Sequence, residues 1–275
     1  MKKITIFSDI DGTFIDKSYR IGISGEFLKE TAERFRIIFV SSRTPEEIIH
    51  LQDYTGLKGD FIAENGAVLG FLDPPDTIRN NVKTEILKDY HLIFTGKNAN
   101  ELLSETEAIL KRMNIQTVIL NKLEPDKAAL LSGYDTGSAV RSLSRRATVL
   151  FRAENITGNQ AVSEEFRKYG ISMIFGGKWL SVSTGFDKGE AVKYYMKLMN
   201  IDPELTAGIG DSENDYSLLE AVKEKFIISD NGHNEKLLTI RGAVKLDHEG
   251  TKGWEEMIRI LSEKITKIGG QNEKI

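Results

Sequence analysis

The sequence of 275 residues contains no cysteine, which excludes disulfides and thiolate metal sites. A chain without cysteine fits the reducing cytoplasm, where we expect this protein. No apolar run approaches the ~18 residues of a membrane helix, and Lys2-Lys3 lead into a predicted strand rather than a signal peptide. Neither sign of charge is in large excess, since the net charge is −4. This balance argues against broad binding to nucleic acids or membrane surfaces.

The chain has enough apolar residues for ordinary globular burial, because hydrophobic residues make up 40% of it. Its 275 residues are many for a single core and suit two domains, or one domain that carries an insertion. Composition gives no indication of the oligomeric state.

Strand and helix signals alternate in the first part of the chain. Apolar residues at 4–8 and 36–41 predict buried strands, and 61–63 predicts a short third strand. Helices are predicted after Ser24 and Thr44, because each is an N-cap residue followed by apolar residues at helical spacing. Such alternation implies a parallel sheet covered by helices.

From about residue 97 the pattern changes to long helices and hairpin-like strands, and the strand–helix alternation resumes at Lys188. We therefore predict an α/β fold with a doubly wound parallel-sheet core, formed by residues 1–96 and 185–275, and an inserted α+β cap domain at 97–184. Within the insertion, helices are predicted at 98–113, over most of 125–145 and at 158–169, and strands at 116–120, 147–152, 171–175 and 179–182.

Two acidic turns carry the functional signal of the chain. Asp9 and Asp11 follow the first predicted strand, where open α/β sheets bind ligands. A second acidic turn, from Gly208 to Asp215, follows another predicted strand near the end of the chain. Carboxylates are costly to gather in one place unless a cation or a reaction requires them.

The order of these motifs resembles the haloacid dehalogenase superfamily over nearly the whole chain. Asp9-Ile10-Asp11-Gly12-Thr13 matches its first motif, and Ser41 ends the second predicted strand. Lys188 opens a later helix, and the turn from Asp211 to Asp215 closes the set. Each motif lies at a strand end or a helix start, which makes the match specific.

The resemblance implies a phosphatase that forms an aspartyl-phosphate on a small phosphorylated substrate. Asp9 would attack phosphorus, which splits one slow hydrolysis into two steps. Asp11 would protonate the departing sugar oxygen and later deprotonate water. Ser41 and Lys188 would hold the phosphoryl oxygens, so that catalysis consists of positioning and charge neutralisation.

The same resemblance implies a magnesium ion, because a carboxylate that meets a dianionic phosphate needs its repulsion cancelled. Oxygen ligands suit this ion, and Asp9, the backbone carbonyl of Asp11, and Asp211 would provide them. Asn214 and Asp215 would lie behind these ligands, where they hold waters or orient the ligating groups.

The position and pattern of the insertion resemble the Cof-like branch of the superfamily, whose cap closes over sugar phosphates. Short stretches also resemble the mannosyl-3-phosphoglycerate phosphatase family. These stretches are Ser41-Ser42-Arg43-Thr44, Glu64-Asn65-Gly66, Gly176-Gly177-Lys178-Trp179 and Gly250–Trp254. The resemblance implies that Gly176, Gly177 and Lys178 contact the substrate from the cap.

Three positions in the cap depart from that family. The stretch Thr148-Val149-Leu150-Phe151 stands where the family has Ser-Glu-Pro-Phe, and so lacks an acidic group. Lys178 replaces an arginine, which keeps the charge but loses a bidentate fork. Ser181 stands where a histidine is expected. We therefore expect an active core, with mannosyl-3-phosphoglycerate as one candidate among phosphorylated sugars.

Each motif residue also has a purely structural explanation. Ser41 could cap a strand end, Asp215 could cap a helix, and Lys188 could be a solvated helix residue. Asn65-Gly66 predicts a type I′ turn, whether or not it lines the mouth of the site. The segment 176–178 could be a plain β-turn with an exposed lysine.

Two other functions are compatible with the motifs. A phosphotransferase or phosphomutase would pass the phosphoryl group to a sugar hydroxyl instead of water. A non-catalytic sugar-phosphate-binding protein is expected to lack at least one of the four motif residues, yet all are present in this chain. Those residues are Asp9, Asp11, Lys188 and Asp211.

Overall fold

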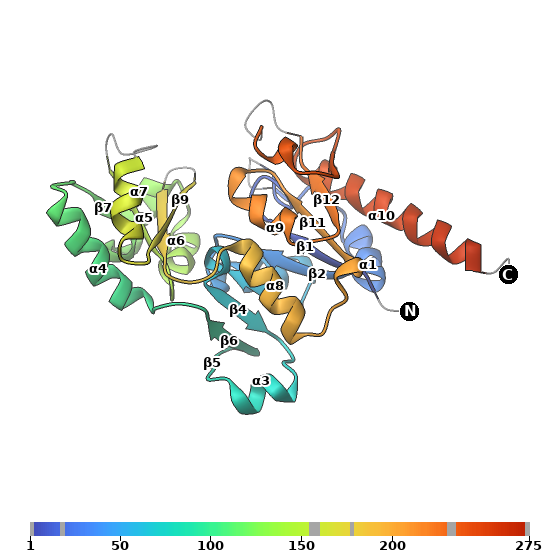
Figure 1. The fold of residues 1–275 in the computed structure, drawn as a ribbon, viewed down its shortest axis with the longest axis horizontal. Coiled ribbons are helices and arrows are strands. Elements are labelled where there is room, and N and C mark those ends of the chain that lie inside the picture. The colour runs from blue at the N-terminus through green and yellow to red at the C-terminus, as the bar shows by residue number, and fades with distance from the viewer. Residues whose placement is uncertain (1–2, 17–19, 154–159, 177–178, 230–234, 273–275) are drawn as a thin grey trace.

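The computed structural model describes residues 3–16, 20–153, 160–176, 179–229 and 235–272. Within these residues, nine strands form one large sheet and four form a small one. Figure 1 shows the small sheet and its helices to one side of the large sheet, with both chain ends on the opposite side. We call the elements from α4 to β10 the small module and the remaining elements the core. No helix in the described part of the chain has the length and hydrophobicity needed to cross a membrane.

The large sheet has the strand order β13-β12-β11-β1-β2-β3-β4-β6-β5. The strands from β13 to β3 pair in parallel, whereas β4, β6 and β5 pair antiparallel at one edge. The predicted doubly wound parallel sheet is confirmed, with this antiparallel edge added to it. Its strands are β1 (Thr5–Ser8), β2 (Arg36–Val40), β3 (Phe61–Ala63), β4 (Val68–Phe71), β5 (Glu85–Leu87), β6 (Tyr90–Phe94), β11 (Thr206–Gly210), β12 (Glu224–Ile227) and β13 (Ala243–Lys245).

Helices cover both faces of the large sheet. Alternate residues of β1 enter different apolar clusters, since Ile6 packs with Trp254 on one face and Phe7 packs with Tyr195 on the other. The helices of the first face are α1 (Gly25–Arg34), α2 (Pro45–Thr55) and α10 (Gly250–Asn272), and those of the second are α3 (Asp76–Asn81), α8 (Lys188–Leu198) and α9 (Tyr216–Glu220). The predicted N-caps are confirmed: the side chains of Ser24 and Thr44 accept hydrogen bonds from backbone N–H groups in the first turns of α1 and α2.

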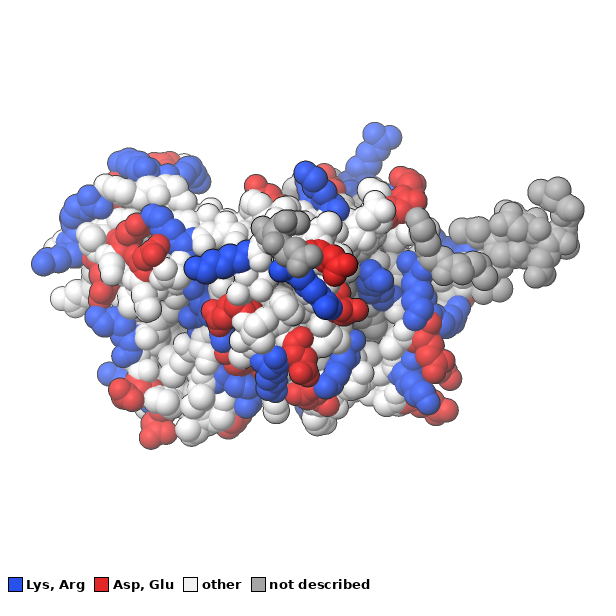
Figure 2. Space-filling view, turned by 90° about the horizontal axis from the view of Figure 1, so that it is seen from below, with Lys and Arg blue, Asp and Glu red and all other residues white. Residues whose placement is uncertain are grey.

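The small module is an antiparallel sheet of order β7-β8-β10-β9 with helices on both faces, which agrees with the predicted α+β pattern. Its elements are α4 (Ala99–Arg112), β7 (Val118–Ile119), α5 (Pro125–Ser132), α6 (Thr136–Leu143), β8 (Val149–Arg152), α7 (Gln160–Arg167), β9 (Ser172–Gly176) and β10 (Trp179–Ser183). The strand predicted at 116–120 is shorter than expected, because the chain turns into a 3₁₀ helix at Leu120–Lys122. On the face shown in Figure 2, basic and acidic side chains are interspersed rather than gathered by sign.

Candidate active site

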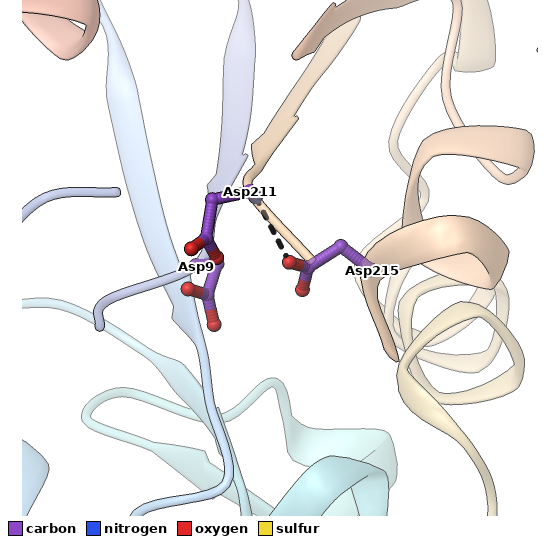
Figure 3. Close-up of side chains that lie close together, drawn as sticks. All are labelled: Asp9, Asp211 and Asp215. Atoms are coloured by element: carbon purple, nitrogen blue, oxygen red, sulfur yellow. Dashed lines mark hydrogen bonds between the residues drawn. The ribbon is translucent and has the colours of Figure 1, made fainter. Parts of the chain in front are cut away.

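The two predicted acidic turns lie side by side at the carboxyl ends of β1 and β11. These strands are parallel neighbours, with Phe7 opposite Gly208. Oxygens of Asp9, Asp211 and Asp215 all lie within 4.8 Å of one another, and Figure 3 shows their side chains converging. Segments that are distant in sequence therefore place three carboxylates around one point.

Lys188 lies between two of these carboxylates. Its Nζ donates hydrogen bonds to Asp9 Oδ1 and to Asp215 Oδ1, each at 2.6 Å. It is the first residue of α8, which begins at a capping box formed by Asp187 and Glu190. With only 1% of its side chain exposed, Lys188 is not the solvated helix residue that the sequence left open.

The charges of this cluster do not balance. Burial raises the pKa of Asp9 well above its usual value, the neighbouring Asp215 and Asp211 raise it further, and Lys188 acts in the opposite direction. Burial disfavours the charge on Lys188, but Asp215 and Asp9 outweigh this effect and raise the Lys188 pKa overall. The site would therefore gain from an additional cation. A set of carboxylate oxygens is the donor chemistry that suits a hard divalent ion such as magnesium.

Asp215 also holds the second acidic turn in shape. Its Oδ2 accepts hydrogen bonds from the N–H groups of Asp211 at 3.1 Å and Ser212 at 3.2 Å, the first of which is drawn in Figure 3. Asn214 accepts a 2.6 Å hydrogen bond from Ser212 Oγ within the same turn. The chain continues as a 3₁₀ helix at Glu213–Asp215 and becomes α-helical at α9. Asp215 thus takes part in helix capping, as the N3 residue of a capping box that begins at Ser212, and it also contacts Lys188.

Gly12 allows the first acidic turn to approach the second. Its φ of +83° lies in the left-handed region, and a Cβ placed there would lie 2.2 Å from Asp211 Oδ2. Glycine avoids both the strain and the overlap. The tight turn after β1 therefore depends on this residue.

Asp11 is held by Arg43, a residue that the motif analysis did not assign to the site. Arg43 Nε donates to Asp11 Oδ2 at 2.9 Å, and its Nη2 donates to Oδ1 at 2.6 Å. This bidentate pair fixes the direction of the Asp11 carboxylate, of which 41% remains exposed. The signal for Arg43 in the sequence was its place in Ser41-Ser42-Arg43-Thr44, one of the stretches that carry the family resemblance.

Ser41 is buried just after β2, and both its hydroxyl and its carbonyl oxygen accept hydrogen bonds. Its Oγ accepts a 3.2 Å hydrogen bond from Arg43 N–H, so it caps the loop as the structural alternative proposed. Its carbonyl accepts a 2.9 Å hydrogen bond from Asn65 N–H. The predicted type I′ turn is confirmed, because Asn65 and Gly66 both have positive φ and Ala67 N–H donates to Glu64 O at 3.2 Å. The turn therefore braces the loop that contains Ser41.

Of the three residues predicted to contact substrate from the small module, the structure describes one. Gly176 is the last residue of β9 and pairs with Trp179, whereas Gly177 and Lys178 lie outside the described residues. Ser181 is buried on β10, opposite Leu150 of β8.

Comparisons with known proteins agree with this architecture. A family model described as haloacid dehalogenase-like hydrolase matches residues 6–238. A glucosyl-3-phosphoglycerate/mannosyl-3-phosphoglycerate phosphatase of Persephonella marina is 28% identical over 270 residues, which is 94% of this chain and 98% of the relative. A protein of the same description from Methanococcoides burtonii is 27% identical over 277 residues, covering 98% of this chain and 100% of the relative.

Solved structures show the same fold at lower sequence identity. A haloacid dehalogenase-like hydrolase from B. subtilis has a TM-score of 0.66 at 16% identity, over 93% of this chain and 99% of that one. Another from Bacteroides thetaiotaomicron has a TM-score of 0.66 at 17% identity, over 94% and 100%. At such identities the likeness concerns the fold alone.

Proposed function

Because this chain belongs to the haloacid dehalogenase-like hydrolases, we propose that it is a magnesium-dependent phosphatase that hydrolyses a small phosphorylated sugar. The observation that carries this proposal is the cluster of the buried residues Asp9, Lys188 and Asp215 with the half-buried Asp211, at the carboxyl ends of two neighbouring strands. Two relatives over nearly full length are named as phosphatases of glucosyl- and mannosyl-3-phosphoglycerate. These names make a hexosyl-3-phosphoglycerate the first substrate to test.

In the proposed first step, Asp9 attacks phosphorus. Lys188 donates a hydrogen bond to Asp9 Oδ1, so Oδ2 is the oxygen that would form the new bond to phosphorus. The bond from phosphorus to the sugar oxygen breaks, and Asp11 gives a proton to that oxygen. Arg43, whose two hydrogen bonds use both Asp11 oxygens as acceptors, would hold the ionised Asp11 that this proton transfer leaves and that takes a proton from water in the second step.

In the second step, Asp11 would take a proton from water, which attacks the phosphorus of the aspartyl-phosphate. Phosphate leaves and the Asp9 carboxylate is restored. Ser41 and Lys188 are proposed to bind the phosphoryl oxygens during both steps. The buried ammonium of Lys188 suits this role, since a charge held away from water interacts strongly with developing negative charge.

Magnesium would be held by Asp9, the backbone carbonyl of Asp11, and Asp211, with Asn214 and Asp215 behind them. When bound, the ion supplies positive charge that offsets repulsion between the phosphate and the carboxylates. The raised pKa of Asp9 supports this assignment, because a nucleophile that burial and its neighbours tend to protonate needs a further cation to stay ionised.

We further propose that residues 97–184 act as a cap over the core formed by 1–96 and 185–275. In this arrangement Gly176, Gly177 and Lys178 would contact the sugar or glycerate part of the substrate. Thr44 Oγ1 donates to Arg141 O at 2.8 Å, and Arg145 Nη1 donates to Ser42 O at 3.1 Å. These two hydrogen bonds join the small module to the loop that follows β2 and support the proposed arrangement.

The proposal is tested by measuring free phosphate released from glucosyl-3-phosphoglycerate, mannosyl-3-phosphoglycerate, sucrose phosphate and p-nitrophenyl phosphate. We expect turnover in the wild type and none in Asp9→Asn, which should still fold. Asp53→Asn, an exposed carboxylate on α2, is the matched control and should retain full activity. Full activity of Asp9→Asn would exclude Asp9 as the nucleophile. Transfer of phosphate to a sugar without its release would identify a phosphotransferase instead.

A further inference from the structure

Glu64 is a fully buried carboxylate to which the mechanism above assigns no task. It lies in the core, in the turn between β3 and β4, yet its hydrogen-bond donors belong to the small module. Its Oε1 accepts from Arg146 N–H at 2.8 Å, and its Oε2 accepts from Ala147 N–H at 3.0 Å and from Thr148 Oγ1 at 2.6 Å. Both carboxylate oxygens are therefore engaged by the segment that leads into β8.

The backbone of the same turn contacts the loop that follows β2. Glu64 N–H donates to Arg43 O, and Asn65 N–H donates to Ser41 O, each at 2.9 Å. Glu64 has a φ of 51°, a left-handed conformation that non-glycine residues seldom adopt. Such strain persists where the surrounding structure demands it and often marks a functional position. Here it accompanies a side chain that points into the small module.

The two ion pairs formed by the Arg146 side chain differ from the hydrogen bonds of Glu64 because they lie nearer the surface. Arg146 Nη1 pairs with Glu46 and its Nε with Glu85, and the Glu85 side chain is 49% exposed. Exposed ion pairs such as Arg146–Glu85 contribute little, and the side chains of the Arg146–Glu46 pair are still 18% and 23% exposed. Glu64 is fully buried, so its hydrogen bonds are the most costly of these contacts to lose. Among these contacts, Glu64 is therefore the one expected to determine where the small module sits.

We propose that Glu64 is a positioning residue that fixes the start of β8 relative to the loop that follows β2, which contains Ser41 and Arg43. This inference rests on the proposed function. Glu64 touches none of the reacting atoms and acts through Ser41 and Arg43 on one side and Thr148 on the other. A carboxylate is needed rather than an amide, because two N–H donors and one O–H donor face it and an amide would turn its own N–H groups toward some of them.

The role predicts a dependence on the size of the substrate. A hexosyl-3-phosphoglycerate would extend into the small module, so its reaction needs the module in place. p-Nitrophenyl phosphate is smaller and relies mainly on the core. In Glu64→Gln, kcat/KM for the hexosyl substrate should fall about 10- to 100-fold. The value for p-nitrophenyl phosphate should change by less than about threefold.

The experiment combines these kinetics with hydrogen–deuterium exchange of peptides spanning residues 144–152, which needs no substrate. Exchange at Arg146 or Ala147 should become at least about tenfold faster in Glu64→Gln, because the glutamine amide keeps one acceptor oxygen and cannot serve both N–H groups as the carboxylate does. Glu85→Gln is the matched control, since it makes the same change at a carboxylate that contacts Arg146 from the surface. It should leave both exchange and kinetics unchanged.

A second variant, Thr148→Val, approaches the contact from the small module and keeps the test valid if Glu64→Gln does not fold. It should lower kcat/KM for the hexosyl substrate about 3- to 10-fold and leave p-nitrophenyl phosphate turnover unchanged. Equal losses on both substrates, or unchanged exchange at 146–147, would overturn the proposal. A wild type that cleaves p-nitrophenyl phosphate but no hexosyl-3-phosphoglycerate would refute the proposed substrate, while the exchange measurement would still decide the role of Glu64.

Discussion

Replacing Lys188 by methionine tests the electrostatics of the site directly. The change keeps an unbranched apolar stem and removes the ammonium group between Asp9 and Asp215, whose oxygens lie 2.6 Å from it. Removing one partner of a buried ion pair costs about 3–5 kcal/mol, because the remaining charge has no counterion. Asp9 can limit this loss by taking up a proton, so we expect a decrease of about 3 kcal/mol in the free energy of unfolding at pH 8.

The pH dependence of this loss has a definite sign. In the wild type, burial and the neighbouring carboxylates raise the pKa of Asp9 despite Lys188, and without Lys188 it should rise further. A carboxyl group whose pKa is higher in the folded than in the unfolded protein favours folding at low pH, and this contribution is lost as pH rises through the folded-state pKa. The difference in stability between Lys188→Met and the wild type should therefore shrink as pH falls from 8 to 5.

The measurement is thermal and urea-induced unfolding at pH 5, 6.5 and 8. A loss of about 3 kcal/mol corresponds to a decrease in Tm of roughly 6–12 °C for a chain of this size. Magnesium chloride at pH 8 should stabilise the variant more than the wild type, because the variant has more uncompensated negative charge. Lys193→Met, at an exposed position of the same helix, is the control and should change stability by less than about 0.5 kcal/mol. An undiminished Tm, or an equal loss at pH 5 and pH 8, would refute the reasoning.

Three further outcomes are expected. EDTA should abolish phosphatase activity and excess magnesium should restore it, whereas unchanged rates in chelator would contradict the metal assignment. Gly12→Ala should lower the free energy of unfolding by about 2 kcal/mol or more, since its Cβ would overlap Asp211, while Gly25→Ala, with open space around it, should change it by less than about 1 kcal/mol. Arg43→Lys keeps the charge but loses the fork that holds Asp11, so kcat should fall about tenfold with little change in KM. A raised KM at unchanged kcat would show that Arg43 serves binding instead.

Features set by local sequence were predictable. Apolar runs directly before Asp9 and Asp211 identified two strand ends, and parallel pairing of the strands brings those ends together. Ser24 and Thr44 predicted helix starts because an N-cap depends on residues within one turn. The order of the motifs added the expectation that Lys188 would lie at the same site as Asp9, which the structure confirms.

Features set by distant contacts were not predictable in this way. Glu64 stands beside Asn65-Gly66, a composition typical of an exposed turn, yet it is buried by a segment more than 80 residues away in sequence. Arg43 pairs with Asp11 across 32 residues, and no periodicity encodes that contact. The antiparallel edge formed by β4, β6 and β5 likewise depends on pairing between strands, each of which alone gives a weak signal.

The two connections between the core and the small module touch each other. A Cβ on Gly96 would lie 2.5 Å from Gly185 N, and Lys97 N–H donates to Thr184 Oγ1 at 2.8 Å. The chain therefore leaves the large sheet and returns to it at a single place. An insertion anchored in this way can be exchanged for one of another size without shifting the register of any core strand. Under the proposed cap role, replacing the whole segment would change the substrate while the acidic cluster of the core stays as it is.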